Sequence, residues 1–244
     1  APQDQTETPP ATQPFKPFWY PNNQYNGNNN DNPWTNNNIT DDGTYRQTND
    51  MAGPNLGCPP AIMPLTNDRQ ALLSKIASLK PVNRGGTMAN QGLQAGWFTL
   101  SPQWRGLWGG TTPSNLPLNY GTQDMNKAVV LLTDGNNEWY SYKPQGDYTS
   151  YQRIGDGLLG TTNLNQATTA INNRMLTLCT NMKAAGITLF TITVGGSTSD
   201  ATRKLYQQCA SPGPNHYFDS PNSTDLQTIF RQIAGQLSNL RIIR

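Results

Sequence analysis

The sequence predicts an α/β fold with a parallel sheet, and two observations carry that prediction. Residues 127–133 form a short, continuous apolar run, and residues 187–194 form a second run rich in β-branched side chains, so both are expected to be strands. Segments with apolar residues at helical spacing lie between and after these runs. Because strand and helix alternate, the strands are expected to be parallel neighbours joined by helical crossovers.

A helix is expected at residues 66–80, ahead of the first strand. Thr66 or Asn67 can cap it, and Pro81 stops it. Its apolar face consists of Leu72, Leu73, Ile76 and Leu79.

A glycine-containing loop and a second helix complete the region before the first strand. The loop is Gly85-Gly86-Thr87, and the helix covers residues 88–99, although Gly92 and Gly96 weaken it. The strand at 127–133 is then expected to be central, with helices on both faces, because its apolar run does not alternate with polar residues.

After a long loop at residues 134–160, the chain continues as alternating helices and strands. Apolar residues at helical spacing run from Leu164 to Met182, and Gly186 is suited to end that helix. A helix at 199–210 follows the strand at 187–194, and a short edge strand is expected at 216–219. The final helix is capped by Asn222 and has a core face of Leu226, Ile229, Phe230, Ile233 and Leu237.

The composition excludes two classes of function. Only 13% of the 244 residues are charged and the formal net charge is +2, so no basic surface for nucleic acid is expected. The longest apolar runs are far shorter than the ~20 residues that a membrane-spanning helix needs, so no membrane span is expected in this chain. Heavy use of Asn, Ser and Thr with few Lys and Glu residues favours a secreted protein.

Residues 1–57 are expected to form an Asn- and Pro-rich arm, separate from an α/β domain at 58–244. Ten of the seventeen residues at 22–38 are Asn, and no strand or helix period is visible. This composition favours a linker or a disordered insertion. Scattered aromatic residues leave a second interpretation open, in which the arm wraps a partner. Because the arm has few aliphatic residues, we expect that something other than itself orders it.

Asp134 and Thr87 are the candidate binding residues. Asp134 ends the most apolar strand and is followed by Gly135 and two Asn residues, and ligands of open parallel sheets bind beyond the carboxyl ends of strands. The alternative is that Asp134 is a turn residue that caps its loop. Thr87 is likewise either a metal ligand or the cap of the helix that follows it.

Together the two motifs resemble the second half of a von Willebrand factor A (vWA) domain. A Gly-Gly-Thr loop precedes a helix, and the next strand ends Leu131-Leu132-Thr133-Asp134-Gly135. The resemblance implies a doubly wound parallel sheet. It also implies that Thr87 and Asp134 help to form a metal-ion-dependent adhesion site for Mg²⁺ or another divalent cation.

Residues 53–244 also resemble the TadE/TadG-like proteins of bacterial tight-adherence (Flp) pilus assembly. The matching motifs are Gly53-Pro54-Asn55 with Cys58, Ile62 to Thr66, Gly92-Leu93 with Gly96-Trp97, Leu100-Ser101-Pro102, Leu178-Cys179 with Met182-Lys183, Cys209-Ala210-Ser211, Tyr217-Phe218, and Ile233-Ala234 onward to Leu240-Arg241. The resemblance implies an extracytoplasmic protein (periplasm, cell surface or secreted) that binds a protein partner in surface adhesion or pilus assembly.

The chain departs from the family pattern at the first strand. That strand ends in Asp-x-Ser-x-Ser, which supplies the other metal ligands, and no such motif occurs here. The chain therefore resembles the C-terminal part of a longer precursor. Two ligands are too few to hold Mg²⁺ tightly, because the ion takes six oxygens. The expected partner is the missing N-terminal part of the precursor or a neighbouring subunit, docked along the open edge of strand 127–133.

Three cysteines are present, too far apart for a Cys-x-x-Cys motif. Cys179 and Cys209 lie on successive expected helices that flank one strand, where a disulfide or two small buried residues would both fit. The family resemblance favours the disulfide. Cys58 would then remain for an intermolecular bond.

No enzyme is expected. The single histidine, His216, lies beside the edge strand among aromatic residues, and the spacing of Asp134 and Glu138 does not support an acid–base pair. Neither a nucleophile elbow nor a phosphate-binding loop occurs in the sequence. The alternative to metal-dependent protein binding is a carbohydrate-binding or purely structural surface protein that uses Trp and Tyr side chains without a metal.

Overall fold

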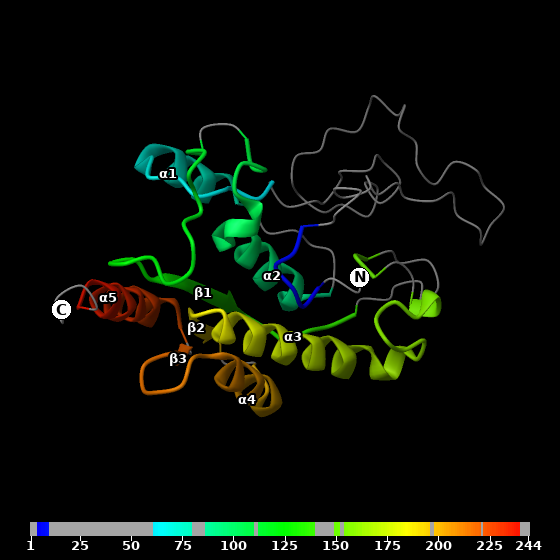
Figure 1. Cartoon of the computed structure of the whole chain (residues 1–244). Coiled ribbons are helices and arrows are strands. Elements are labelled where there is room, and N and C mark those ends of the chain that lie inside the picture. The colour runs from blue at the N-terminus through cyan, green and yellow to red at the C-terminus, as the bar shows by residue number, and fades with distance from the viewer. Residues whose placement is uncertain are drawn as a thin grey trace, which may run out of the picture.

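The centre of the fold is a parallel sheet. In the computed structural model of the chain, the described residues are 4–9, 61–79, 86–109, 112–139, 149–151, 154–195, 198–220 and 222–239. Their sheet has the order β1–β2–β3, and the strands are β1 (Lys127–Thr133), β2 (Ile187–Val194) and β3 (Tyr217–Ser220) (Figure 1). Both strand pairs are parallel. The predicted α/β fold with a parallel sheet is therefore confirmed.

The strand register brings the carboxyl ends of the three strands to one edge. Lys127 lies opposite Ile187, and Thr133 lies opposite Thr193, so β1 and β2 pair along the full length of β1. Thr193 in turn lies opposite Asp219 of β3. The first two strands have the predicted bounds, and β3 begins one residue later than expected. Side chains at the ends of β1, β2 and β3 consequently share one rim of the molecule.

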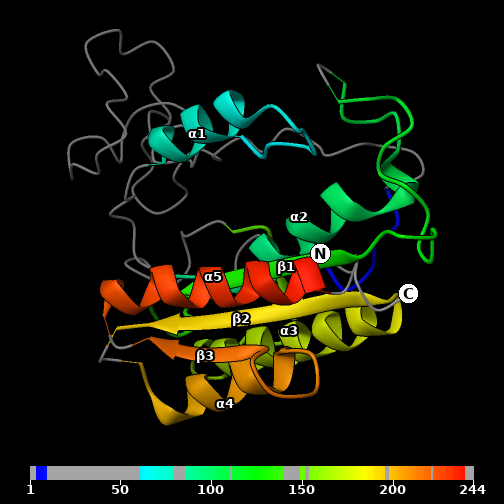
Figure 2. The same ribbon diagram turned by 90° about the vertical axis from the view of Figure 1, so that its left-hand side faces the viewer.

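Helices cover the sheet from both faces. One face carries α2 (Ala89–Leu100), α3 (Ala167–Ala184) and α4 (Asp200–Cys209), and the other carries α5 (Ser223–Asn239). Figure 2 shows α5 on one side of β2 and β3, and α3 and α4 on the opposite side. The core of the first face includes Leu93, Trp97, Met175, Leu178, Leu189 and Leu205. The core of the second face consists of Phe190, Ile192, Ile229 and Ile233.

The N-cap residues of α1 (Arg69–Ser78) and α2 differ from those predicted, whereas the N-cap of the final helix, α5, is the predicted one. Helix α1 is capped by Asp68, whose Oδ1 accepts from the N–H groups of Gln70 and Ala71 at 2.8 and 3.0 Å. Thr66 instead accepts from the N–H of Asp68, one step further from the helix. Met88, not Thr87, is the N-cap residue of α2. Asn222 caps α5 as predicted, accepting from Thr224 and Asp225.

The apolar face of helix α1 is exposed. No residue of α1 is buried. The side chains of the predicted apolar face are 40–63% exposed, and they are Leu72, Leu73, Ile76 and, directly after the helix, Leu79. Neither core on the two faces of the sheet includes a residue of α1.

The expectation that helices cover both faces of β1 is wrong for one face. Val129 and Leu131 pack against the core under α2 and α3. Val130 and Leu132 point to the opposite face and are 37% and 47% exposed. The α5 core is built on Phe190 and Ile192 of β2, so α5 leaves this part of β1 uncovered. Among the described strands, β1 pairs with β2 alone, so its outer edge is open there.

A disulfide joins α3 to α4. The sulfur atoms of Cys179 and Cys209 are 1.98 Å apart, and both residues are buried. The predicted pairing is therefore confirmed. Cys58, predicted to be available for an intermolecular bond, lies outside the described residues, as does most of the expected arm at 1–57.

Candidate functional site

The candidate site lies where β1 ends. Thr133 is the last residue of the strand and is buried, whereas Asp134 directly after it is exposed. The Asp134 carboxylate accepts no hydrogen bond from the residues that the structure describes. A carboxylate with this freedom at the carboxyl end of a parallel strand is placed to meet a ligand from outside the domain.

The loop that carries Thr87 is fixed beside the segment that follows Asp134. The Thr87 N–H donates to the Glu138 carbonyl at 3.0 Å, and the Glu138 N–H donates to the Thr87 carbonyl at 2.8 Å. Thr87 is exposed. The structure therefore brings the two predicted loops together, with Thr87 paired to a residue four positions after Asp134.

The buried Asn137 side chain connects the loop after β1 to α2 and α3. Its side chain is buried, and Oδ1 accepts from the N–H of Ala89 at the start of α2, at 2.9 Å. Its Nδ2 donates to Asn172 Oδ1 of α3, also at 2.9 Å. One amide therefore links the end of β1 to two helices. The sequence placed two Asn residues after Gly135 but did not reveal this role, which depends on a partner 48 positions away.

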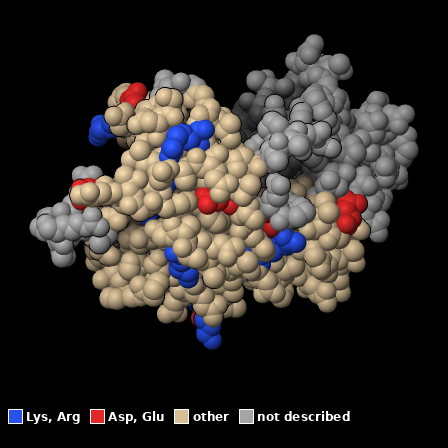
Figure 3. All heavy atoms as spheres, viewed as in Figure 1, with Lys and Arg blue, Asp and Glu red and all other residues tan. Residues whose placement is uncertain are grey.

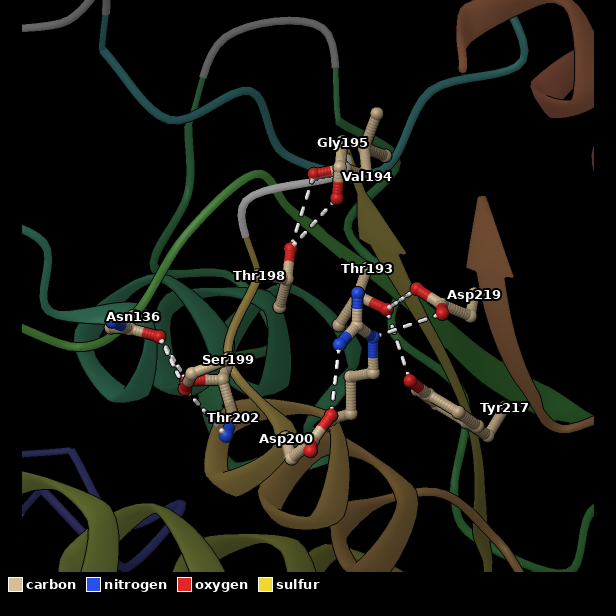
Figure 4. A network of polar contacts seen from close by, with 11 residues as sticks. Asn136, Thr193, Val194, Gly195, Thr198, Ser199, Asp200, Thr202, Tyr217 and Asp219 are labelled. Atoms are coloured by element: carbon tan, nitrogen blue, oxygen red, sulfur yellow. Dashed lines mark hydrogen bonds and ion pairs between the residues drawn. The ribbon is translucent and has the colours of Figure 1, made fainter. Parts of the chain in front are cut away.

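Asn136 makes the corresponding link to α4. Ser199, the N-cap of α4, donates to Asn136 Oδ1 at 3.1 Å, and the hydroxyl of Thr202 donates to the same oxygen (Figure 4). The first turn of α4 is thereby attached to the loop after β1. The rim around Asp134 is consequently supported by α2, α3 and α4, which reduces the conformational freedom that a partner must restrict on binding.

A second polar cluster lies at the ends of β2 and β3. Thr193 Oγ1 donates to Asp219 Oδ1 at 2.8 Å and lies 3.0 Å from the Tyr217 hydroxyl. Because the single Thr193 proton goes to Asp219, Tyr217 is the donor in its own contact. Arg203 bridges Asp219 and Asp200 at 3.0 and 3.1 Å. Figure 4 shows this cluster beside the Asn136 contacts.

Tyr206 lies under the rim. It belongs to α4 and is fully buried, and its hydroxyl forms no hydrogen bond with any described residue. Burial raises the pKa of Tyr206, the nearby Thr133 side chain opposes this shift, and the negative charge of Asp134 adds to it. The hydroxyl therefore stays protonated at neutral pH.

The described residues offer oxygen ligands of the type that a divalent cation takes, but too few of them to complete its coordination. A carboxylate and a hydroxyl, from Asp134 and Thr87, are the oxygen ligands that Mg²⁺ takes. The ion needs six oxygens, and no group of three or more His, Cys, Asp or Glu residues able to hold a metal occurs in the described part of the chain. These residues alone therefore do not complete a metal site.

Surface features bear on the other predicted functions. Lys and Arg residues are scattered over the face in Figure 3, with no large basic patch. Among the described helices, none is long and apolar enough to cross a membrane. Trp97, Trp104 and Trp139 are buried, so these three side chains fill the core and do not present a face to a sugar.

The comparisons with known proteins identify the family. The family model for the von Willebrand factor type A domain matches residues 59–232, which is more than half of the chain. The chain therefore belongs to the vWA domain family. No curated protein and no solved structure gave a match. Membership indicates a protein-interaction or adhesion-type function, and vWA domains are common in extracellular proteins.

Proposed function

We propose that the chain is a non-catalytic, extracytoplasmic protein-binding domain that acts in bacterial surface adhesion or pilus assembly. The observation that carries the proposal is the exposed Asp134 carboxylate, which accepts no hydrogen bond from the described residues, with the Thr87 loop hydrogen-bonded beside the segment that follows it. The Cys179–Cys209 disulfide supports a location outside the cytoplasm, because such bonds persist in oxidising compartments. The resemblance to TadE/TadG-like proteins is the basis for naming pilus assembly.

A divalent cation is the finer part of this proposal. Asp134 and Thr87 would hold the ion from the domain side, and an acidic group of the partner would supply further oxygens. The bound ion would bring a positive charge to the contact between two carboxylates. On this view the domain alone binds Mg²⁺ weakly, and the partner and the ion bind together.

The partner we propose is a segment that completes the sheet. It is either the missing N-terminal part of a precursor or a neighbouring subunit. The open outer edge of β1 and the exposed side chains of Val130 and Leu132 support this proposal. An added strand would pair with the N–H and C=O groups along that edge.

The test compares partner binding with Mg²⁺ and with a chelator. Proteins cross-linked to the purified chain on intact cells are quantified by mass spectrometry for the wild type, Asp134→Asn, Thr87→Val and Thr87→Ser. We expect Asp134→Asn and Thr87→Val to lose the partner that the chelator removes, and Thr87→Ser to retain it because it keeps the hydroxyl. Equal recovery with all four proteins, with or without chelator, would contradict the metal-dependent site.

A further inference from the structure

The first described residues of the chain, 4–9, lie against α2, α3 and the loops beside them (Figure 1, dark blue). Asp4 is 1% exposed, although it belongs to the Asn- and Pro-rich N-terminal region. Its hydrogen-bond partners are 147 and 170 positions further along the chain. Asp4 is therefore buried against the folded domain, and we call the surface that α2, α3 and the adjoining loops present to this segment the α2–α3 groove.

One end of the α2–α3 groove is built to receive a carboxylate. Arg174 Nη1 donates to Asp4 Oδ1 at 2.7 Å, and the Tyr151 hydroxyl donates to Asp4 Oδ2. The fully buried Tyr151 oxygen accepts from the amides of Asn90 and Gln91. Because a hydroxyl has one proton and its oxygen is already an acceptor twice, that proton is directed at Asp4. The groove therefore offers a cation and a fixed donor at this point.

The other end repeats the same chemistry with Glu7. The hydroxyls of Ser101 and Tyr120 both donate to Glu7 Oε2. Ser101 Oγ accepts from the Gln103 N–H, and Tyr120 Oη accepts from Trp97 Nε1 at 2.8 Å, so both protons remain free for the carboxylate. The groove thus contains two carboxylate positions that match acidic residues three positions apart in a peptide.

Donors from the domain also meet the peptide backbone between these positions. Asn181 Nδ2 donates to the carbonyl of Gln5 at 2.9 Å, and Gln94 Nε2 donates to that of Thr6 at 3.1 Å. Trp104 Nε1 donates to the Glu7 carbonyl at 2.7 Å. In each of these contacts the groove donates and the segment accepts. Such one-sided complementarity recognises an acidic peptide by both its backbone and its side chains.

We propose that the α2–α3 groove is a binding site for a short acidic peptide with the pattern Asp-x-x-Glu. Residues 4–9 occupy it as a ligand, and their covalent connection through residues 10–60 is not required for binding. A peptide of the same pattern added from outside competes for the groove. This site is separate from the rim around Asp134, and its occupancy does not depend on a metal.

The test uses the full chain with a site for a sequence-specific protease inserted after Asn30. After cleavage, gel filtration shows whether the N-terminal fragment stays with the rest of the chain, and circular dichroism checks that the rest stays folded. A fluorescent peptide of residues 1–10 is then added in excess, and its binding is followed by anisotropy. The matched control peptide carries Asp4→Asn and Glu7→Gln and has the same length.

We expect the fragment to co-elute with the folded remainder and the labelled peptide to replace it. The affinity of the control peptide should be lower by about a hundredfold. The reason is that each of the two charge-assisted contacts contributes about tenfold to the affinity. Because the control alters the peptide and not the domain, misfolding does not affect the comparison. Release of the fragment, unfolding on cleavage, or equal affinity of the two peptides would each overturn the proposal.

Discussion

Tyr151 and Tyr206 are both fully buried, yet their hydroxyl groups have opposite surroundings. Tyr151 Oη contacts Asn90, Gln91 and Asp4, whereas Tyr206 Oη has no hydrogen bond among the described residues. A buried polar group without a partner loses its hydration and gains nothing in return. The two residues therefore form a matched pair in which the same substitution has different consequences.

We predict that Tyr206→Phe leaves the free energy of unfolding unchanged or raises it by up to about 1 kcal/mol, because it removes an unsatisfied hydroxyl. Tyr151→Phe should lower it by about 1–3 kcal/mol, because two amides and the Asp4 carboxylate lose a partner. Urea unfolding of both variants measures the difference. A loss of stability in Tyr206→Phe as large as in Tyr151→Phe would contradict the assignment.

Alkaline pH should destabilise the fold through its buried tyrosines. Burial raises the pKa of Tyr120 to about 12, with a contribution from its hydrogen bond to Glu7, and burial also raises that of Tyr151. The unfolded chain loses these protons near pH 10, so the native state binds more protons between pH 10 and 12, and stability falls as the pH rises through that window. Lys127 acts in the opposite sense, because burial lowers its pKa.

The measurement is the free energy of unfolding against pH for the wild type and for Tyr120→Phe. The variant should lose less stability between pH 10 and 12, since it has no proton to release at that position. Below pH 9 the two curves should run parallel. Identical slopes above pH 10 would show that Tyr120 does not contribute to the alkaline limb.

At the scale of elements, the disulfide is the covalent link between two crossover helices. Cys179 of α3 and Cys209 of α4 are separated by 30 positions, and both side chains lie in the core that includes Leu178 and Leu205. Closing a loop of this length reduces the entropy of the unfolded chain. The helices also pack independently of the bond, so the fold is expected to survive its removal.

We predict that the double variant Cys179→Ala and Cys209→Ala is less stable by about 3–4 kcal/mol, which is the loop-closure value for a separation of this size. Its circular dichroism spectrum should match that of the wild type at room temperature. The control is the wild type under reducing conditions, which should show a similar loss. A change below about 1 kcal/mol would mean that the bond does not restrict the unfolded chain.

At the scale of the whole molecule, the sheet is covered unevenly. The face under α2, α3 and α4 is continuous from β1 to β3, whereas α5 leaves Val130 and Leu132 of β1 exposed. An apolar strand with an open edge is a surface on which another strand can pair. This property belongs to the arrangement of the layers and to no single element.

We predict that the chain associates through β1, and that Val130→Thr with Leu132→Thr weakens this association while changing stability by about 1 kcal/mol or less. Native mass spectrometry over a range of concentrations measures the fraction of monomer. Leu107→Thr, which alters a 61% exposed leucine in a loop, is the matched control and should behave like the wild type. A cooperatively folded 26.8 kDa monomer at all concentrations would contradict the proposed partner strand.

Patterns among neighbouring residues were enough to predict the local elements and the position of the rim. A continuous apolar run predicted β1, a run of β-branched residues predicted β2, an amide cap predicted the start of α5, and the strand-end rule placed Asp134 at an exposed edge. These features depend on neighbouring residues in the chain, whose spacing decides which backbone conformation buries apolar groups and satisfies polar ones. The Cys179–Cys209 pairing was favoured by family resemblance and is confirmed by the fold.

The contacts between residues far apart in the chain could not be predicted and are known from the folded structure alone. The docking of Asp4 and Glu7, the role of Asn137 between two helices, and the uncovered face of β1 follow from contacts across many tens of positions. Composition placed residues 4–9 in a region without regular structure, because a polar segment cannot bury apolar area to offset its backbone entropy. Hydrogen bonds to groups that the folded domain has already oriented provide that stabilisation instead, and no local pattern in the sequence records them.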